Sequence, residues 1–360
     1  MELKNRRNEF ATYNQWNDKL CVPNKKIRLI IDTDTKNEVD DQFAIAWALN
    51  KENRFSIEAI YAAPFHHGCF RQFNKNQDPS AYQELNGTSK NPEDGMEQSY
   101  EEILKILDIM DKPLKDRVYR GAGSYMESKN IPVENMASRD LVNRAMNSSE
   151  TIYVAAIGAA TNIASAILME PKIKEKIVVV WLGGNELSFE RGIEFNLIQD
   201  VFAAQVLFDS GVPLIWIPCN NVASMLSISE LELKEKLFGK SKIGTYLAET
   251  VLEQFEKKES GLGMPKLLRE SSLLGNNDQG EEYLDLFPFQ EIAWSRIIWD
   301  MAAIAVLANP NWVPTMQIPS PILEDDYSWK QCETRHKIRV ARYCYRDLIF
   351  GDLFYALSEN

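Results

Sequence analysis

The segment that decides the fold is residues 27–49, IRLIIDTDTKNEVDDQFAIAWAL. It begins with an apolar run typical of a buried strand and ends with an apolar run typical of a helix. Between them, five acidic side chains lie within ten positions: Asp32, Asp34, Glu38, Asp40 and Asp41. Like charges this close repel one another, and a divalent cation commonly offsets that repulsion. The segment therefore predicts a metal-dependent site at a strand-to-helix junction of an α/β protein.

The chain on either side of this segment continues the alternation of strand and helix. Apolar, β-branched runs predict strands at residues 27–32, 56–63, 117–122, 151–158, 176–184 and 212–218. The segments between several of them have apolar residues at helical spacing, which is typical of a parallel sheet covered on both faces. We therefore expect an α/β fold with an open, mostly parallel, doubly wound sheet and helices on both faces.

The pattern changes after Pro218. Residues 228–261 are mainly helical in pattern, and we expect a helical excursion near residues 228–290 that forms a wall or lid on a single domain of residues 1–360. Residues 295–310 are expected to form one helix that ends at Pro310. A late strand is expected within residues 336–343, and a C-terminal helix over residues 346–357.

The composition excludes several classes of function. The chain has 360 residues, 45% of them hydrophobic, which is ample for a large core. Asp and Glu number 52 against 40 Lys and Arg, a net charge of -12 that argues against nucleic-acid binding. No apolar run approaches the ~20 residues of a membrane span, and no secretory signal is visible. The five cysteines are scattered without a CxxC pair. We expect a cytoplasmic protein that binds neither nucleic acid nor membrane.

Motifs along the chain, taken in order, resemble the nucleoside hydrolase family of the inosine–uridine-preferring type. DTDTKNEVDD at residues 32–41 resembles a long-loop variant of the family's D-x-D and D-D signature. The later motifs are VYRGAG at 118–123, IGAATNIASAI at 157–167, VVVWLGG at 178–184, EFNLIQD at 194–200 and IIWDMAAIAVL at 297–307. The resemblance thus runs from about residue 27 to about residue 307.

This resemblance implies a calcium-dependent hydrolase of the N-glycosidic bond of a ribonucleoside or related N-riboside. Three carboxylates and one backbone carbonyl would bind Ca²⁺: Asp34, Asp41, Asp300 and Ile157. Asp34 would also take the proton from the attacking water. Three side chains would bind ribose hydroxyls: Asp40, Glu194 and Asn196. Relatives are often dimers or tetramers, so the resemblance also implies a homo-oligomer.

The base-recognition side departs from the family. The usual His before the last Asp, a candidate acid for the leaving base, is Trp299 here, and the ribose-binding Asn after the second strand falls near Phe65. His66 or His67 could replace the missing acid, because both follow a strand at the expected catalytic edge. Trp299 could instead stack on a base. Asp32 is expected to support the loop rather than to bind the cation.

Three other interpretations stay open. The acids near residue 40 could form a solvated turn and a helix N-cap, since acids favour helix starts. The missing His allows a non-catalytic or altered-substrate member that binds a sugar or nucleoside. LIIDTDT, residues 29–35, also resembles the motif of Mg²⁺-dependent phosphatases of the haloacid dehalogenase type. However, Asp40 and Asp41 come too early for the acidic pair of that family.

Overall fold

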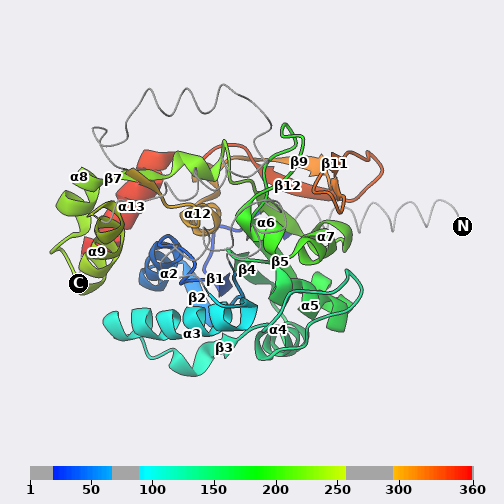
Figure 1. Ribbon diagram of the computed structural model, residues 1–360, viewed down its shortest axis with the longest axis horizontal. Helices are drawn as coiled ribbons and strands as arrows, with labels where there is room; N and C mark the ends of the chain where they lie inside the picture. The colour runs from blue at the N-terminus through cyan, green and yellow to red at the C-terminus, as the bar shows by residue number, and fades with distance from the viewer. Residues whose placement is uncertain (1–18, 67–88, 257–294, 359–360) are drawn as a thin grey trace, which may run out of the picture.

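An eight-stranded sheet forms the centre of the computed structural model, which describes residues 19–66, 89–256 and 295–358 (Figure 1). Its strands are β1 (Ile27–Thr33), β2 (Phe55–Ala62), β3 (Val118–Arg120), β4 (Ile152–Ala156), β5 (Ile177–Leu182), β6 (Leu214–Ile217), β9 (Thr315–Pro319) and β12 (Lys337–Ala341). Their order is β3-β2-β1-β4-β5-β6-β12-β9, and all neighbours are parallel except β9, which is antiparallel to β12. The predicted open, mostly parallel sheet is confirmed.

Helices cover both faces of this sheet (Figure 1). One face carries α2 (Asp41–Asn50), α3 (Pro92–Ile109), α9 (Lys242–Glu256), α12 (Met301–Ala308) and α13 (Arg346–Ser358). The other carries α4 (Met136–Met146), α5 (Thr161–Met169), α6 (Phe195–Gln199) and α7 (Val201–Asp209). Successive residues of a strand point to opposite faces, so Leu29 and Ile31 enter one core and Ile30 enters the other. This explains why the strands are continuously apolar, and it confirms the doubly wound prediction.

The strand order also indicates where a site can form. β2 and β4 lie on opposite sides of β1, so the order of strands along the sheet reverses there. In open α/β sheets, ligands bind beyond the carboxyl ends of the strands at such a reversal. Asp32 pairs with Ala156 at the carboxyl ends of β1 and β4, so the acids that follow β1 lie at this position.

The segment expected as one helix over residues 295–310 is different in the structure, and that prediction is wrong at its start. Residues Ser295–Ile297 form β8, which pairs antiparallel with β7 (Ser227–Ser229). The backbone N–H of Ile298 then donates to the carbonyl of Leu226. The pairing with β7 keeps this part of the chain extended, so α12 begins only at Met301. Asp300 therefore lies at the amino end of a helix rather than within one.

The expected helical excursion is mainly helical over its described residues 228–256, although residues 228 and 229 belong to β7. It contains α8 (Glu230–Glu232), the π-helical turn η6 (Leu233–Leu237) and α9, whereas residues 257–290 lie outside the described residues. Shorter elements complete the fold: η3 (Lys115–Arg117), η4 (Pro171–Glu175), η5 (Ala223–Met225), η9 (Pro310–Trp312), β10 (Ile322–Leu323) and β11 (Trp329–Lys330). Within the described parts of the chain, no helix has both the length and the apolar character needed to cross a membrane.

Candidate active site

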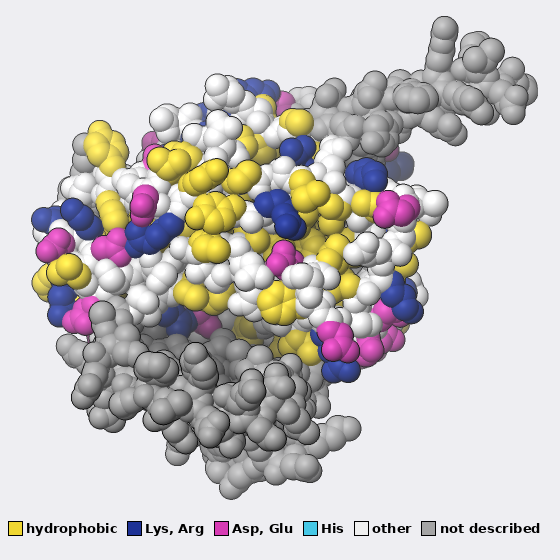
Figure 2. All heavy atoms as spheres, turned by 90° about the horizontal axis from the view of Figure 1, so that it is seen from above, with side chains coloured by type: hydrophobic (Ala, Val, Ile, Leu, Met, Phe, Trp, Pro, Cys, Tyr) yellow, Lys and Arg dark blue, Asp and Glu magenta, His cyan; other side chains and the backbone are white. Residues whose placement is uncertain are grey.

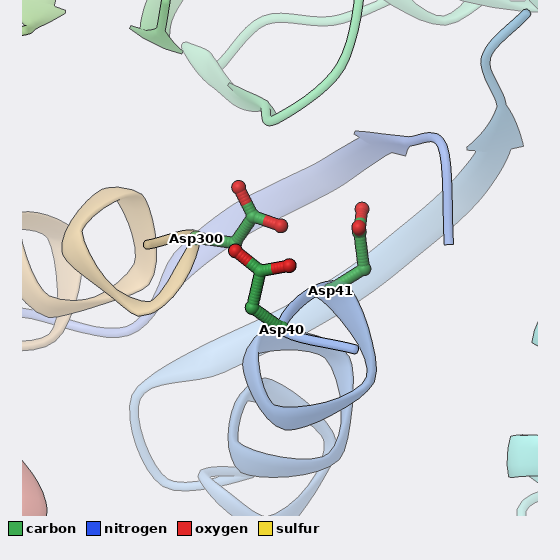
Figure 3. Close-up of side chains that lie close together, drawn as sticks. All are labelled: Asp40, Asp41 and Asp300. Atoms are coloured by element: carbon green, nitrogen blue, oxygen red, sulfur yellow. The ribbon is translucent and has the colours of Figure 1, made fainter. Parts of the chain in front are cut away.

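Three buried carboxyl groups meet at the carboxyl edge of the sheet. Figure 3 shows Asp300, from the start of α12, facing Asp40, with Asp41 beside them at the start of α2. One carboxylate oxygen from each residue lies within 4.8 Å of the other two. All three side chains are buried, and buried like charges are strongly unfavourable unless protons or a cation compensate them. The arrangement is therefore that of a candidate cation site.

The position of these acids at helix starts does not explain their burial. Asp40 occupies the N-cap position of α2 and Asp300 that of α12, but neither side chain makes a capping hydrogen bond. The alternative of a solvated turn with a helix cap is therefore wrong for these residues. Instead, the amino ends of two helices converge on the carboxylates, and the positive ends of the helix dipoles offset part of the negative charge.

Asp34 lies next to the three acids and is also buried. Its Oδ2 atom has no hydrogen-bond partner among the residues that the structure describes. A Cβ added at Gly158 would lie 3.0 Å from its Cγ, so the carboxyl end of β4 packs directly against it. Burial and the neighbouring charges of Asp41 and Asp40 raise the pKa of Asp34 well above its ordinary value. An unsatisfied, buried carboxylate oxygen beside three further acids fits a hard cation such as calcium, which prefers oxygen ligands.

Burial also raises the pKa of Asp300 and Asp41. Burial, followed by the charges of Asp40 and Asp41, raises the pKa of Asp300 well above its ordinary value. Burial raises the pKa of Asp41 to about 7, although the hydroxyl of Thr33 donates a hydrogen bond to its Oδ1 atom. Without a cation, the folded protein must therefore keep protons on carboxyl groups that an unfolded chain would release.

Asp32 has different contacts from the acids that follow it. Its Oδ1 atom accepts a hydrogen bond of 2.8 Å from Nδ2 of Asn162. The same amide group donates to the carbonyl of Ala62 at 3.3 Å, and its Oδ1 accepts from the backbone N–H of Ala122 at 2.8 Å. Asn162 thus connects the carboxyl ends of β1 and β2 with the segment after β3. These contacts support the structural role expected for Asp32, whose pKa burial raises to about 7.

Ile157 and Asn196 lie on the β4 side of the cluster. The backbone N–H of Ile157 donates to the carbonyl of Asp32 at 2.8 Å. Its own carbonyl accepts from Nδ2 of Asn196 at 3.1 Å, and the same nitrogen donates to the carbonyl of Leu182 at 3.1 Å. A carbonyl oxygen has two lone pairs, so Ile157 can accept this hydrogen bond and still bind a cation.

Glu194 is held by backbone amides. Its Oε2 atom accepts from the N–H groups of Gly184 at 2.7 Å and Leu197 at 3.3 Å, and its Oε1 atom accepts from that of Asn196 at 3.0 Å. It therefore caps the start of α6, and burial raises its pKa. The cap fixes the carboxylate on the same short helix as Asn196, the other ribose-contact candidate of this motif.

His66 belongs to a polar network after β2. Its Nδ1 atom lies 2.8 Å from the carbonyl oxygen of Ser89, and its backbone N–H donates to Oε1 of Gln199 at 2.8 Å. The hydroxyl of Tyr125 donates to the same Oε1 atom at 2.7 Å. The Nε2 donor of Gln199 is buried and has no partner within the described part of the chain. The sequence analysis missed Gln199, although it lies in the EFNLIQD motif.

The two remaining leaving-group candidates differ in what the structure describes. Trp299 directly precedes Asp300, is half-buried and packs against the core on the α2 side of the sheet. His67 lies outside the described residues. The structure thus brings Asp34 close to the cluster of three acids and places His66 after β2, at the same edge of the sheet.

The sequence analysis also missed an ion pair beside the cluster. Arg296 in β8 donates through Nη2 to Oε2 of Glu38, in the loop that precedes α2. Its charge opposes the effects of burial and neighbouring acids on the pKa of Asp40. The available signal was an arginine four positions before Asp300, next to the apolar residues 297–299.

Comparison with known proteins gives the class of this protein. The model of the inosine-uridine preferring nucleoside hydrolase family matches residues 93–342, more than half of the chain. The chain therefore belongs to the nucleoside hydrolase family. The match includes Ile157, Glu194, Asn196 and Asp300 but begins after the DTDTKNEVDD segment. Membership removes the basis of the phosphatase alternative, which rested on that segment alone.

Curated relatives align over a shorter stretch. The chain is 38% identical over 82 residues to the pyrimidine-specific ribonucleoside hydrolase RihB of Escherichia coli, which is 22% of this chain and 26% of that relative. A Shigella boydii relative is 38% identical over 84 residues, 35% of its length. The chain thus spans about a quarter to a third of the length of the curated relatives it matches.

Solved structures share the fold over nearly the whole chain. A plant nucleoside hydrolase has a TM-score of 0.62 and 16% identity, covering 94% of this chain and 100% of its own. The purine-preferring ribonucleoside hydrolase of Gardnerella vaginalis has a TM-score of 0.61 and 19% identity, covering 92% and 98%. The type III effector protein XopQ, complexed with adenosine diphosphate ribose, has a TM-score of 0.59 and 12% identity, covering 97% and 98%. At these identities the likeness shows the fold alone.

Proposed function

We propose that this protein is a calcium-dependent hydrolase that cleaves the N-glycosidic bond of a ribonucleoside or a related N-riboside. The observation that carries the proposal is the meeting of Asp40, Asp41 and Asp300, all buried, at the carboxyl edge of the sheet. The membership of the chain in the nucleoside hydrolase family supports it. The names of the similar proteins specify pyrimidine-specific and purine-preferring enzymes, so we propose the ribosyl class of substrate and no particular base.

The proposed cation ligands are three carboxylates and a backbone carbonyl: Asp34, Asp41, Asp300 and Ile157. When bound, calcium would supply positive charge that balances the acids and makes the loss of a proton from a nearby water easier. Asp40 would bind a ribose hydroxyl. Because its carboxylate lies within 4.8 Å of those of Asp41 and Asp300, a sugar bound to it would lie directly beside the cation site.

Asp34 would act as the general base. Its Oδ2 atom has no partner in residues 19–66, 89–256 and 295–358, so it is available to accept a proton from the attacking water. Both donated hydrogen bonds of Asn196 go to carbonyl oxygens, which leaves its Oδ1 atom to accept from a ribose hydroxyl. Glu194, fixed by its helix cap, would bind a further hydroxyl. These carboxylates would stabilise the positive charge that develops on the ribose as the C–N bond breaks.

The acid for the leaving base would be His66. Its Nδ1 atom is engaged by the carbonyl of Ser89, so Nε2 is the nitrogen that would deliver a proton to the base. His67 remains a second candidate, and Trp299 is a candidate for stacking on the base.

The proposal is tested with the full chain and a panel of purine and pyrimidine ribonucleosides. Released base is followed by chromatography and free ribose by a reducing-sugar assay, before and after chelation of metal and re-addition of Ca²⁺ or Mg²⁺. We expect release of both products, loss on chelation and recovery with Ca²⁺. Asp34→Asn should abolish release, while Asp116→Asn, at an exposed position, should not change it. No release from any nucleoside by protein that binds calcium would refute the proposal.

A second candidate function is binding of a riboside without turnover, or turnover of an altered substrate. Trp299 in place of the family's usual His favours it, and one protein of similar fold, XopQ, was solved with ADP-ribose. Calorimetric titration with ADP-ribose and with nucleosides separates the two candidates. Binding without release of base or ribose would support the second function, whereas turnover of a nucleoside would exclude it.

We also propose that the protein works in the cytoplasm and forms a homo-oligomer. The four described cysteines form no disulfide, which supports a reducing compartment.

The support for a homo-oligomer is apolar surface. Figure 2 shows a face on which hydrophobic side chains gather between charged ones. Several large apolar side chains are exposed near the C-terminus: Met316, Tyr343, Tyr345 and Leu348. Light scattering of the purified chain tests this proposal, and a monomer at micromolar concentration would contradict it.

A further inference from the structure

A buried ion pair joins the two segments that supply the acid cluster. Glu38 precedes Asp40 by two positions, and Arg296 precedes Asp300 by four. Nη2 of Arg296 donates to Oε2 of Glu38, and the two side chains are only 11% and 17% exposed. The paired residues are 258 positions apart in the sequence. The ion pair is therefore a direct link between the loop before α2 and the segment before α12.

The arginine side of this link has a fixed backbone. Arg296 lies opposite Ile228 in the β7–β8 pair, and the N–H of Ile298 continues the pairing by donating to the carbonyl of Leu226 at 2.8 Å. The side chains of Ile228 and Ile298 are fully buried. A guanidinium group held by such a strand presents its donors in a rigid fork, unlike a flexible lysine.

On the glutamate side, the loop between β1 and α2 is held by weaker contacts. Between β1 and α2, the N–H of Asn37 donates to the carbonyl of Asp34 at 2.7 Å. The side chain of Gln42 donates to the carbonyl of Glu38 at 3.4 Å. A second ion pair from this loop, between Lys36 and Glu102, is 3.5 Å long, and the side chain of Lys36 is 43% exposed. The pair with Arg296 is thus the more buried ion pair that holds the loop.

We propose that Glu38 and Arg296 are positioning residues that set the spacing between the loop acids and Asp300, and so determine calcium affinity. This proposal rests on the proposed function, because it concerns the same cation site. Neither residue is proposed to touch the cation. The pair has no net charge, so its contribution comes from geometry: it holds the carboxylates together before the ion binds. Mutation of residues that orient metal ligands without touching the metal usually changes metal affinity by about 10- to 100-fold.

The direction in which Arg296→Gln changes calcium affinity distinguishes a positioning effect from a purely electrostatic one. Arg296→Gln removes a positive charge near the acids, so electrostatics alone would make calcium bind more tightly. If the arginine positions the loop, the same substitution weakens binding, by about tenfold or more. Glu38→Gln weakens binding in either case and serves as the reference. The double variant Glu38→Gln/Arg296→Gln leaves the net charge unchanged and should bind calcium about as weakly as Arg296→Gln, because the two residues act as a unit.

The experiment is calorimetric titration of Ca²⁺ into metal-stripped full-length protein, with melting temperatures measured for every variant. Arg296→Lys, which keeps the charge, should recover part of the affinity. The matched control is Asp209→Asn/Arg335→Gln, which removes a pair with side chains 35% and 18% exposed. That pair lies near the amino ends of β6 and β12, at the opposite edge of the sheet, so its loss should leave calcium affinity unchanged.

Two outcomes would overturn different conclusions. Unchanged or tighter calcium binding by folded Arg296→Gln, with normal binding by the wild type, would refute the positioning role alone. A wild-type chain that binds no calcium would refute the proposed cation site itself. If Arg296→Gln does not fold, the double variant decides, because it leaves neither charge buried without its partner: wild-type affinity in the double variant would also refute the positioning role.

Discussion

Replacing Asp300 by Asn is expected to have opposite effects in the metal-free and the calcium-bound protein. The carboxylates of Asp40, Asp41 and Asp300 lie within 4.8 Å of one another. At an effective dielectric constant of about 20, two unit charges at that distance repel by about 3 kcal/mol. Asp300→Asn keeps the shape of the side chain and removes its charge. Without metal at pH 8, the wild type must either bear this repulsion or hold a proton that the unfolded chain would release, so the variant should have a free energy of unfolding up to about 3 kcal/mol higher than the wild type.

The pH dependence of this difference follows from the pKa of Asp300. Burial and its acidic neighbours raise that pKa well above the ordinary value of 3.8. The folded protein then retains a proton that the unfolded chain loses, so the free energy of unfolding falls as the pH rises above about 4. Asn does not titrate. The advantage of the variant in the metal-free state should therefore shrink as the pH falls from 8 toward 4.

With calcium bound, the wild type should be more stable than Asp300→Asn. A ligand at 100 times its dissociation constant stabilises the folded state by about 2.7 kcal/mol, and Asp300→Asn should lose most of this gain because a neutral amide oxygen replaces a carboxylate ligand. Urea unfolding, followed by the fluorescence of the eight tryptophans, measures both effects with metal-stripped and calcium-loaded protein. Asp116→Asn, at an exposed position, is the control and should match the wild type. A metal-free variant less stable than the wild type at pH 8 would contradict repulsion by Asp300, and equal stabilisation of both proteins by calcium would contradict its role as a ligand.

Three further substitutions test other contacts of the site. Thr33→Val removes the hydroxyl that donates to Asp41 and should weaken calcium binding by about tenfold or more in calorimetry; unchanged affinity would exclude that role. Gly158→Ala places a Cβ 3.0 Å from Cγ of Asp34 and should lower kcat by about 100-fold; a wild-type rate would contradict the base role of Asp34. His66→Ala should lower turnover of nucleosides by about 100-fold but spare 4-nitrophenyl riboside, whose leaving group needs no acid; equal losses on both substrates would count against His66.

Much of the fold could be predicted because its signals are local. A strand buried on both faces must be continuously apolar, and KIVVVWLGG at residues 176–184 gave β5 for that reason. The apolar run at the end of residues 27–49 predicted a helix, and α2 covers it from Asp41 to Asn50. The predicted helix start was too early because residues 295–297 form β8 and pair with β7, which lies about 70 positions earlier. Such pairing is decided by tertiary contacts that the local pattern does not contain.

The same distinction applies to the site. The acids of residues 32–41 and the unusual Asp300 were visible because a charge in an apolar context needs a partner. The ion pair between Glu38 and Arg296 was not visible, since both residues are ordinary surface types and their contact joins distant segments. Likewise, the sequence indicated Glu194 as a ribose contact, but the structure adds a helix cap that uses both of its oxygens.

The cation-binding part of the site and the part that protonates the leaving base differ in how strongly their chemistry restricts the residues that can serve. A hard cation requires oxygen ligands at fixed positions, so its acids stay at motif spacings and can be recognised in order along the chain. Protonation of a leaving base requires only a donor at the right place, and a histidine from any loop at the carboxyl edge can supply it. That freedom would allow Trp299 to stand where the family resemblance leads us to expect His. It also makes His66 testable on physical grounds: its Nδ1 atom is already bound by the carbonyl of Ser89, so an acid role depends on Nε2 alone.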